Sequence, residues 1–355
     1  MTESRWKNLQ DTRTTIQSIG YWAAQEQYPM HKLLKFVVKA EKGGFNTTMT
    51  SDHFHPWWHD NAFGNFTWTW IAAAAERTRK MQFITGVTAP IYRYHPAIIA
   101  QAFASLDVLY PGRIGLGLGS GEAMNEAPLG FDWPKARARL ARTKESIEII
   151  KKLWGQNGNN NNNNVDDGFV NFNGEYFLLR NAKLYTPPSG HIPIFMAATG
   201  QHSVKVAARY ADGLITYLNP QESAKALETF DKTVEESGLS QKPKIAEYKV
   251  SFSDDYNKAL KSAYFWRATL IKNVFDSDIS DPRKLQQKAL REVPDKELEK
   301  SIDIITSIED SISSIEKYFR AGFTTVYVHS SSPDEIKFVQ EFSKKVLPYY
   351  SKARQ

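Results

Sequence analysis

Short apolar runs and longer amphipathic segments alternate along the whole chain. The apolar runs are rich in β-branched and aromatic residues, and the apolar residues of the segments between them repeat at helical spacing. Strands are predicted at residues 15–22, 47–52, 81–89, 114–119, 192–198, 213–217, 245–252 and 324–329. Helices are predicted around apolar Leu33, Leu34, Val37 and Val38, and at residues 70–79, 96–109, 136–154, 202–210, 221–236, 257–270 and 335–347.

Eight such strand–helix repeats predict an α/β fold of the single (β/α)8 TIM-barrel type. In such barrels the catalytic groups lie on the loops that follow the strands. A doubly wound open sheet is the alternative architecture for the same alternation. The barrel is the better match to the number of repeats.

Three segments interrupt the repeat. Residues 157–164 are mostly asparagine, cannot bury apolar area, and are predicted to be a disordered surface loop. Residues 169–179 predict a hairpin that turns at Asn173 and Gly174. Residues 272–301 are charged and punctuated by proline, which predicts an inserted helical excursion before the last repeat. We therefore expect one domain over residues 1–355, with insertions after the fourth and seventh strands.

Composition supports a large enzyme-like core. Apolar residues make up 41% of the chain and aromatic residues 13%, which argues against disorder. The absence of cysteine excludes disulfides, a thiolate nucleophile and cysteine–zinc sites. The polar first residues contain no signal-peptide core, and no apolar run approaches the roughly 18 residues of a membrane span. We expect a cytoplasmic protein with no membrane partner.

The net charge of +6 is the one feature of the composition that favours nucleic-acid binding. The lysines and arginines are scattered among 39 acidic residues, however, and no basic run or nucleic-acid motif is present. A pocket for an anionic cofactor explains the surplus positive charge better than nucleic-acid binding does. No nucleic-acid partner is expected.

The first candidate for chemistry is His53, which lies where the second predicted strand opens into a loop, beside Asp52 and close to Trp57. An imidazole titrates near neutral pH and can accept an alcohol proton while the carbon loses a hydride. A histidine satisfied by backbone hydrogen bonds is the structural alternative. His53, His55 and His59 could also hold a metal, but no carboxylate–histidine motif of metal-ligand spacing accompanies them.

The second candidate is Glu122, which follows the alternating glycines Gly115, Gly117 and Gly119 at the end of the fourth strand. Glycines there let a flat ring approach the backbone, and a carboxyl beyond them can deliver a proton to that ring. An acidic residue at the start of a helix is the structural alternative. The glycine spacing is a poor match to a dinucleotide-binding loop, because no ribose-binding acid follows at the expected distance.

Further candidates are residues 199–203, between the fifth strand and its helix, where free backbone N–H groups suit a phosphate. An ordinary turn is the alternative. Glu26, after the first strand, is a lone acid whose default place is the solvent. Trp22, Trp57 and Trp58 would by default be core or rim aromatics.

Four stretches of this chain match the motifs of one known family. They are residues 20–27, Ser51-Asp52-His53-Phe54 with Pro56-Trp57, residues 94–104, and Gly119-Ser120-Gly121-Glu122-Ala123 with Asn125-Glu126. The chain resembles the bacterial-luciferase-like superfamily, and within it the branch of dehydrogenases that use coenzyme F420, a deazaflavin. The resemblance extends from about residue 20 to residue 351.

The resemblance implies a role for each matching residue. His53 takes the substrate hydroxyl proton, Glu122 protonates the deazaflavin ring, and Trp57 and Glu26 hold the reacting oxygen and tune the histidine. The implied contacts to the ring and its linker are Asp52, Ser120, Gly121 and Asn125. The implied phosphate contacts are Thr199, Gly200, His202 and Ser203. A cis peptide behind the ring is implied at Gly86 and Val87.

The resemblance also implies the class of activity. A deazaflavin is a hydride carrier, so these proteins are dehydrogenases or reductases of CH–OH groups, and a homodimer is the implied assembly. An FMN-dependent monooxygenase of the same superfamily and a deazaflavin-binding protein without turnover are the alternatives.

One departure from the family concerns the substrate. The sugar-phosphate branch grips its phosphate with a threonine, two lysines and an arginine, at the positions of Tyr217, Pro220, Asp276 and Ser301. Each lost charge-assisted bond is worth roughly 1.5–3 kcal/mol. Glucose 6-phosphate is therefore not the expected substrate. We expect a small-molecule alcohol or sugar derivative, with Tyr217 in its pocket.

Overall fold

The computed structural model describes residues 17–156 and 167–352. Its main sheet contains eight parallel strands that close on themselves, since β11 pairs with β1 and β8 pairs with β9. They are β1 (Ser18–Ala23), β2 (Thr47–Thr50), β3 (Gln82–Thr85), β4 (Ile114–Leu118), β7 (Ile194–Ala197), β8 (Gly213–Thr216), β9 (Lys244–Phe252) and β11 (Thr325–Ser330). This closure confirms the (β/α)8 barrel and excludes the open sheet.

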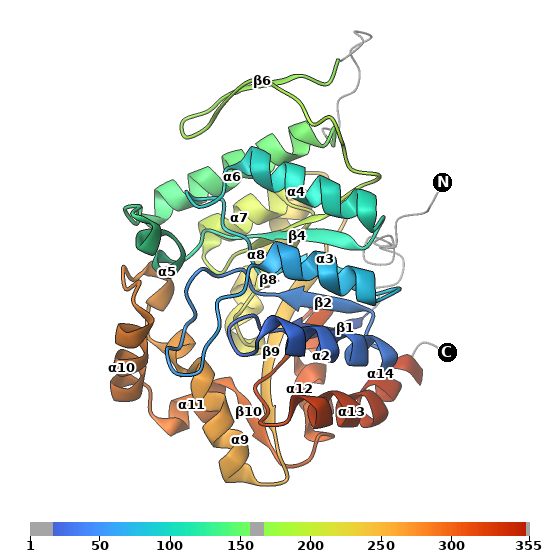
Figure 1. The fold of residues 1–355 in the computed structure, drawn as a ribbon, viewed down its shortest axis with the longest axis vertical. Coiled ribbons are helices and arrows are strands. Elements are labelled where there is room, and N and C mark those ends of the chain that lie inside the picture. The colour runs from blue at the N-terminus through green and yellow to red at the C-terminus, as the bar shows by residue number, and fades with distance from the viewer. Residues whose placement is uncertain (1–16, 157–166, 353–355) are drawn as a thin grey trace.

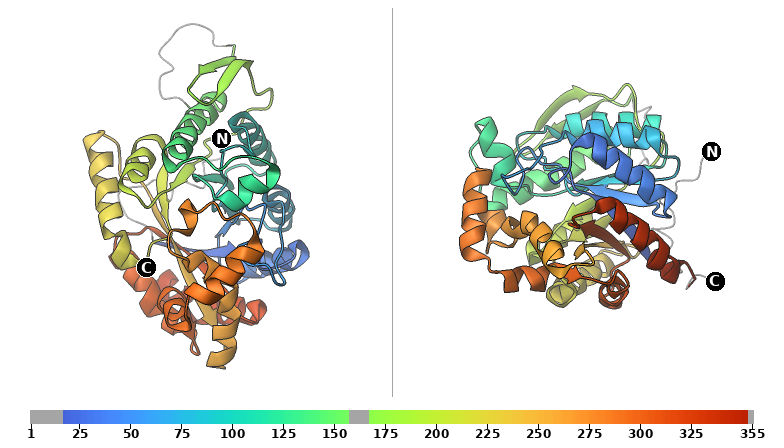
Figure 2. Two further views of the ribbon diagram at one scale, coloured as in Figure 1. Left: turned by 90° about the vertical axis from the view of Figure 1, so that its left-hand side faces the viewer. Right: turned by 60° about the horizontal axis from the view of Figure 1, so that its bottom comes forward.

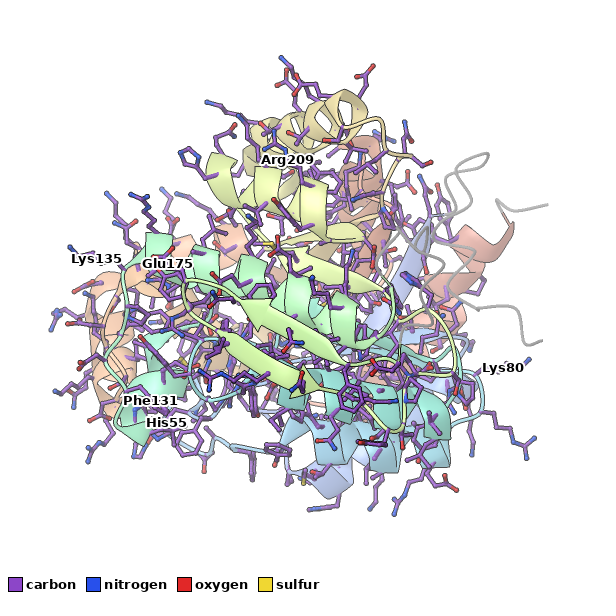
Figure 3. All side chains as sticks on the ribbon, turned by 90° about the horizontal axis from the view of Figure 1, so that it is seen from above. His55, Lys80, Phe131, Lys135, Glu175 and Arg209 are labelled. Atoms are coloured by element: carbon purple, nitrogen blue, oxygen red, sulfur yellow. The ribbon has the colours of Figure 1, made fainter. Side chains whose placement is uncertain are left out.

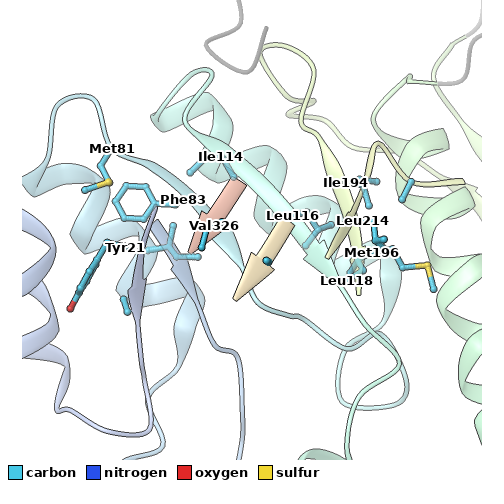
Figure 4. Close-up of a cluster of buried hydrophobic side chains, with 14 of the residues drawn as sticks. Tyr21, Met81, Phe83, Ile114, Leu116, Leu118, Ile194, Met196, Leu214 and Val326 are labelled. Atoms are coloured by element: carbon cyan, nitrogen blue, oxygen red, sulfur yellow. The ribbon is translucent and has the colours of Figure 1, made fainter. Parts of the chain in front are cut away.

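Helices surround the barrel (Figure 1). They are α2 (Met30–Lys42), α3 (Thr67–Arg77), α4 (Pro96–Leu109), α6 (Ala136–Leu153), α7 (Gln201–Tyr210), α8 (Pro220–Glu236), α12 (Asp310–Arg320), α13 (Glu335–Lys345) and α14 (Leu347–Lys352). Their apolar faces pack on outward-facing strand residues, and Figure 4 shows Phe83, Leu116 and Val326 in this cluster. Burial of this amphipathic face stabilises each helix.

Several predicted boundaries differ from the structure. The third strand ends at Thr85 rather than at residue 89. A cis peptide joins Gly86 to Val87, and beyond it Thr88 pairs with Leu118 of β4 only as an isolated bridge. The first strand begins at Ser18, and residues 15–16 of its prediction lie outside the described residues. The predicted helix 257–270 is confirmed only as far as Ala263: α9 (Tyr256–Ala263) ends there, and a 3-10 helix, η2 (Tyr264–Leu270), follows it.

The segment between β9 and β11 is longer and more structured than the sequence predicts. After η2 it contains η3 (Val274–Asp276), α10 (Pro282–Glu292), α11 (Asp295–Ser301) and β10 (Asp303–Ile305). β10 pairs with β9, and neither β10 nor α12 was predicted. In the left view of Figure 2 this segment is orange and lies across the end of the barrel that faces the viewer. We call residues 256–301 the excursion.

The predicted hairpin exists and projects beyond α6 (Figure 1). Its strands are β5 (Val170–Asn173) and β6 (Leu178–Ala182), and Asn173 pairs with Leu178. A turn centred on Asn173 and Gly174 is therefore wrong, because residues 174–177 form the connection. The Glu145 carboxylate explains the wider turn, since it accepts hydrogen bonds from the backbone N–H groups of residues 175, 176 and 177. The asparagine-rich stretch 157–164 lies outside the described residues.

The two ends of the barrel carry different groups. His55 follows β2 and Phe131 follows β4, and Figure 3 shows them together at one side of the molecule. Lys80, which precedes β3, lies at the opposite side. The carboxyl ends of the strands therefore define one rim. Within residues 17–156 and 167–352, no helix has both the length and the apolar character that a membrane crossing requires.

Candidate active site

An open pocket lies at the carboxyl-terminal rim. It is lined by Trp22, Glu26, Ser51, His53, Trp57, Gly86, Val87, Glu122, Tyr217, Glu247, Lys249, Trp266, Thr269, Phe275 and His329. These residues come from the first to the last barrel strand and from the excursion. The structure thus brings the four predicted acid–base and indole residues and Tyr217 to one place. Aromatic walls with a few convergent polar groups are typical of small-molecule sites.

His53 and Glu26 form a close pair in this pocket. The His53 Nδ1 atom lies 2.6 Å from Glu26 Oε1. The other carboxylate oxygen of Glu26 accepts a hydrogen bond of 2.6 Å from the Ser51 hydroxyl. The pair forms because β1 and β2 are parallel neighbours, so the residues that follow them emerge side by side. Glu26 is 1% exposed, so the lone acid of the sequence is not in solvent.

Burial and charge act in opposite directions on this pair. Burial lowers the pKa of His53, but the charge of Glu26 and its hydrogen bond, together with the charge of Glu122, outweigh burial and raise that pKa. Burial raises the pKa of Glu26, and His53 and Ser51 reverse this and lower it. A carboxylate at Nδ1 holds the proton of a neutral imidazole on that atom. The Nε2 lone pair of His53 is then left to accept a proton.

Trp57 forms a wall beside the imidazole. It is buried, and its ring lies edge-on to His53 with the centroids 5.9 Å apart. Phe275, from the excursion, lies edge-on to Trp57 with the ring centroids 5.4 Å apart. The excursion therefore helps to hold the indole at the pocket.

Glu122 is held by a side chain that also binds a distant loop. It occupies the N-cap position of α5 (Ala123–Glu126), without a cap hydrogen bond from its own side chain. Asn125 Nδ2 donates to Glu122 Oε2 at 2.9 Å, and Asn125 Oδ1 accepts from the backbone N–H of Phe54 at 2.7 Å. Asn125 thereby ties the loop that carries His53 to the loop that carries Glu122.

A non-proline cis peptide joins Gly86 and Val87 in the pocket wall, as the resemblance implied. The glycines around it are required by close approach. A Cβ atom on Gly86 would lie 2.6 Å from the Met49 side chain. A Cβ atom on Gly119 would lie 2.4 Å from Val87 Cγ2. The alternating glycines of the fourth strand thus make room for the chain after the third.

Asp52 does not line the pocket. Its Oδ2 accepts a hydrogen bond of 2.7 Å from Thr88 Oγ1, and its Oδ1 accepts one of 3.3 Å from the Tyr94 hydroxyl. Arg93 binds the Asp52 backbone oxygen at 2.8 Å. These contacts show a structural role for the carboxylate, and a direct contact of Asp52 with a coenzyme stays a prediction.

Ser120 and Gly121 continue the chain from β4 toward Glu122. Gly121 has a φ angle of +71°, which favours glycine. Neither residue lines the pocket, so their contact with a coenzyme also stays a prediction.

The residues predicted to bind a phosphate lie at the start of α7. Thr199, Gly200 and His202 are exposed, and Ser203 is partly exposed. Gly200 is the N-cap residue, no side chain caps the helix, and no acidic residue occurs in its first turn. The first N–H groups of a helix without a cap can bind an anion. The geometry suits a phosphate, and that role stays a prediction.

The sequence interpretation missed six residues that line the pocket, namely Glu247, Lys249, Trp266, Thr269, Phe275 and His329. Glu247 and Lys249 share one face of β9, because alternate strand residues point the same way. Two charged residues two positions apart within a buried apolar strand were the signal that could have found them. Nothing comparable marked Trp266, which lies in a 3-10 helix.

The histidines that follow His53 have other partners. His55 Nδ1 lies 3.0 Å from the Ser280 backbone oxygen, and the His59 backbone N–H donates to Gln286 Oε1 at 2.9 Å. Among the residues that the structure describes, no three His, Cys, Asp or Glu side chains are placed to hold a metal ion.

Comparisons with known proteins agree with this geometry. The family model described as luciferase-like monooxygenase matches residues 14–325. An F420-dependent glucose-6-phosphate dehydrogenase of Nakamurella multipartita is 34% identical over 340 residues, covering 93% of this chain and 95% of the relative. One from Rhodococcus erythropolis is 33% identical and covers 93% and 96%. A solved F420-dependent secondary alcohol dehydrogenase, in complex with an F420–acetone adduct, is 34% identical with a TM-score of 0.87, covering 93% of this chain and 98% of that one.

Proposed function

The chain belongs to the luciferase-like monooxygenase family, and from this premise we propose that it is a coenzyme F420-dependent dehydrogenase that acts on CH–OH groups. One observation carries the proposal: His53, backed by Glu26, faces the same pocket as Glu122, beside the cis peptide at Gly86 and Val87. A base and an acid on one pocket suit an alcohol oxidation in which a proton leaves oxygen as a hydride leaves carbon.

The residues present fit such a coenzyme. Gly86, which has no side chain, lines the pocket beside Val87 and Trp22, and such a wall suits a flat ring. The uncapped start of α7 at Gly200 offers N–H groups for its phosphate, and a Cβ atom there would meet only Ser203 Oγ, at 3.7 Å. When bound, a deazaflavin supplies a two-electron hydride acceptor.

The proposed roles follow from the contacts. Oxidation of a secondary alcohol releases a hydride from carbon and a proton from oxygen, and His53 Nε2 accepts that proton. Glu122, held by Asn125, supplies the proton that balances the hydride on the coenzyme side. Glu26 stabilises the imidazolium that forms. Trp57 keeps water from the reacting oxygen.

The charge of the pocket favours an uncharged substrate. Among the lining residues there are three carboxylates, Glu26, Glu122 and Glu247, and a single lysine, Lys249. Asp276, at a position where the sugar-phosphate branch has a cation, instead pairs with Arg139 at 2.8 Å. A phosphate would meet more negative than positive charge. We therefore propose an alcohol or uncharged sugar derivative rather than glucose 6-phosphate.

Anaerobic mixing of the purified protein with oxidised coenzyme F420 and a panel of alcohols tests the proposal. Loss of the coenzyme's visible absorbance with an alcohol is the expected result. Tight binding of F420 without bleaching by any alcohol would indicate a carrier. Binding of FMN in preference to F420, with oxygen consumption, would indicate a monooxygenase.

We also propose that the chain is one domain and assembles as a homodimer. Two apolar residues of α4 are exposed: Ile98 is 53% exposed and Leu109 is 64% exposed. They support an outer helix face as the contact surface between the two subunits. Sedimentation analysis tests the assembly, since a monomer at all concentrations would contradict it. A cytoplasmic location stays a prediction of the sequence.

A further inference from the structure

The pocket contains a second imidazole–carboxylate pair. His329 Nδ1 lies 2.5 Å from Glu247 Oε1. Lys249 Nζ lies 3.6 Å from Glu247 Oε2 and donates a hydrogen bond of 3.3 Å to Thr269 Oγ1. The proposed transfer of a hydride and its proton uses none of these four side chains, although all of them line the pocket.

Glu247, Lys249 and His329 belong to barrel strands rather than to the loops after them. Glu247 and Lys249 lie on β9, and His329 pairs with Lys249 in the register between β9 and β11. The Trp22 ring stacks on His329 at a centroid distance of 5.0 Å, and Trp266 meets it edge-on at 4.3 Å. The pair therefore forms part of the pocket floor.

Polar groups at this depth are unusual for the fold. Barrel interiors are filled mainly by branched apolar side chains, and burying a charge is costly unless it is paired. The His329 side chain is 1% exposed and the Glu247 side chain 7%. In the part of the chain that the structure describes, His329 Nε2 has no hydrogen-bond partner. A buried acceptor without a partner is expensive, and a substrate group could satisfy it.

The hydrogen-bond donors and acceptors of the pocket floor determine which substrate group can bind there. Burial lowers the pKa of His329 despite the opposing effect of Glu247, so the imidazole is neutral, with its proton on Nδ1 toward the carboxylate. Nε2 is then an acceptor, while Lys249 is a donor whose charge Glu247 already balances. An acceptor beside a charge-balanced donor suits a hydroxyl group, which can donate and accept. It does not suit a phosphate.

We propose that Glu247, Lys249 and His329 bind a second hydroxyl of the substrate. The enzyme would then select uncharged alcohols with at least two hydroxyl groups, polyols or sugars, over monoalcohols. This deepens and rests on the proposed dehydrogenase function. Trp22 and Trp266, which also line the pocket, give the C–H surface of such a molecule an apolar contact.

Paired substrates that differ in hydroxyl content test the inference. The probes are butan-2-ol against butane-2,3-diol and cyclohexanol against D-glucose, each with oxidised F420 under anaerobic conditions. We expect kcat/KM to be about tenfold or more higher for the polyhydroxy member of at least one pair, since a site built to bond a hydroxyl rejects an analogue without it. Equal kcat/KM in both pairs, with turnover, would overturn the inference and leave the dehydrogenase function standing.

Two variants test whether His329 and Lys249 cause the preference for polyols. His329→Phe keeps a flat ring but removes the acceptor, and Lys249→Met removes the donor. Each is expected to lower the polyol-to-monoalcohol ratio of kcat/KM about tenfold, mainly through KM. Tyr248→Phe is the matched control on the same strand, because its hydroxyl faces outward and donates to Asp303 at 2.8 Å.

Binding of F420, followed by its fluorescence, shows that each variant is folded. Variants that slow both members of a pair equally would show a structural role and overturn the inference. Absence of turnover with every alcohol would instead overturn the proposed dehydrogenase function, and the inference with it. The two failures are therefore distinguishable.

Discussion

The Nδ1 atom of His53 lies 2.6 Å from Oε1 of Glu26, so one carboxylate sets both the tautomer and the pKa of the imidazole. Two residues that follow different strands thereby act as one base. The contact depends on the parallel pairing of β1 with β2, so a loop that moved either residue would weaken it.

Replacing His53 by alanine should abolish most turnover. Loss of a positioned general base typically costs about 10²–10⁴-fold in rate. Coenzyme affinity should change little, because the phosphate is proposed to bind at α7. Steady-state kinetics and an F420 fluorescence titration measure the two effects. Turnover equal to that of the wild type would refute the assigned role.

Replacing Glu26 by glutamine should shift the pH profile. Glu26 raises the pKa of His53, and the base works only when it is neutral. Removing the charge therefore lowers that pKa and moves the acid limb of kcat/KM to lower pH. The rate at the optimum should fall, because the imidazolium loses its partner. A profile whose acid limb stays in place would show that His53 does not control it.

Asn125 should matter for both activity and stability. Asn125→Ala leaves the Phe54 N–H group without its acceptor and Glu122 without its donor. A buried group left unsatisfied costs about 1–3 kcal/mol, which denaturant unfolding can measure. Asn125→Asp keeps the acceptor for Phe54 but not the donor. Its second carboxylate oxygen would lie against Glu122 Oε2, so like-charge repulsion adds to the loss of the donor, and kcat should fall in both variants. Equal kcat in both variants and the wild type would contradict the bridging role.

Gly119→Ala tests the close approach at the cis peptide. The added methyl group would lie 2.4 Å from Val87 Cγ2, and overpacking of this kind typically costs about 1–3 kcal/mol. Thermal unfolding and F420 titration should both show a loss. Gly190→Ala is the matched control, since a Cβ atom there meets nothing within 4 Å. Similar losses in the two variants would show that contact with Val87 is not the cause of the loss in Gly119→Ala.

Glu335 predicts a pH dependence of stability outside the pocket. Burial raises its pKa from 4.5 to about 8, and the Tyr21 hydroxyl donates to it at 2.8 Å. A carboxyl group with a raised folded pKa contributes stability below its unfolded pKa and loses it as the pH rises toward 8. Glu335→Gln keeps the acceptor for Tyr21 without titrating. The wild type should lose stability relative to this variant between about pH 5 and 8. A difference in unfolding free energy between the wild type and Glu335→Gln that stays constant over that pH range would contradict the raised pKa.

The sequence predicted the barrel and the acid–base residues because both follow local rules. Strand and helix periods repeat along the chain, and loops after parallel strands converge on one rim. His53 and Glu122 stood in such loops, so their meeting could be anticipated. The Glu247–His329 pair was missed, because both residues lie within strands and not in the loops that follow them, and the charged residues at alternate positions of β9 were the one sign of it.

Other features depend on contacts that no local pattern encodes. The Asn125 bridge to Phe54 joins two loops, and Asp52 turned out to bind Thr88 rather than to line the pocket. β10 has three residues, too few for a periodicity to appear. Tertiary packing decides such elements, and single-sequence propensity does not.

The excursion supplies Trp266, Thr269 and Phe275 to the pocket, while every proposed proton-transfer group comes from the barrel itself. Gln286 fastens the excursion to the loop after β2 through the backbone N–H groups of residues 59 and 60. One part of the pocket wall is thus encoded apart from the proton-transfer groups and from the Glu247–His329 pair. Exchange of the excursion between related barrels would reshape that wall and leave both sets of barrel residues in place.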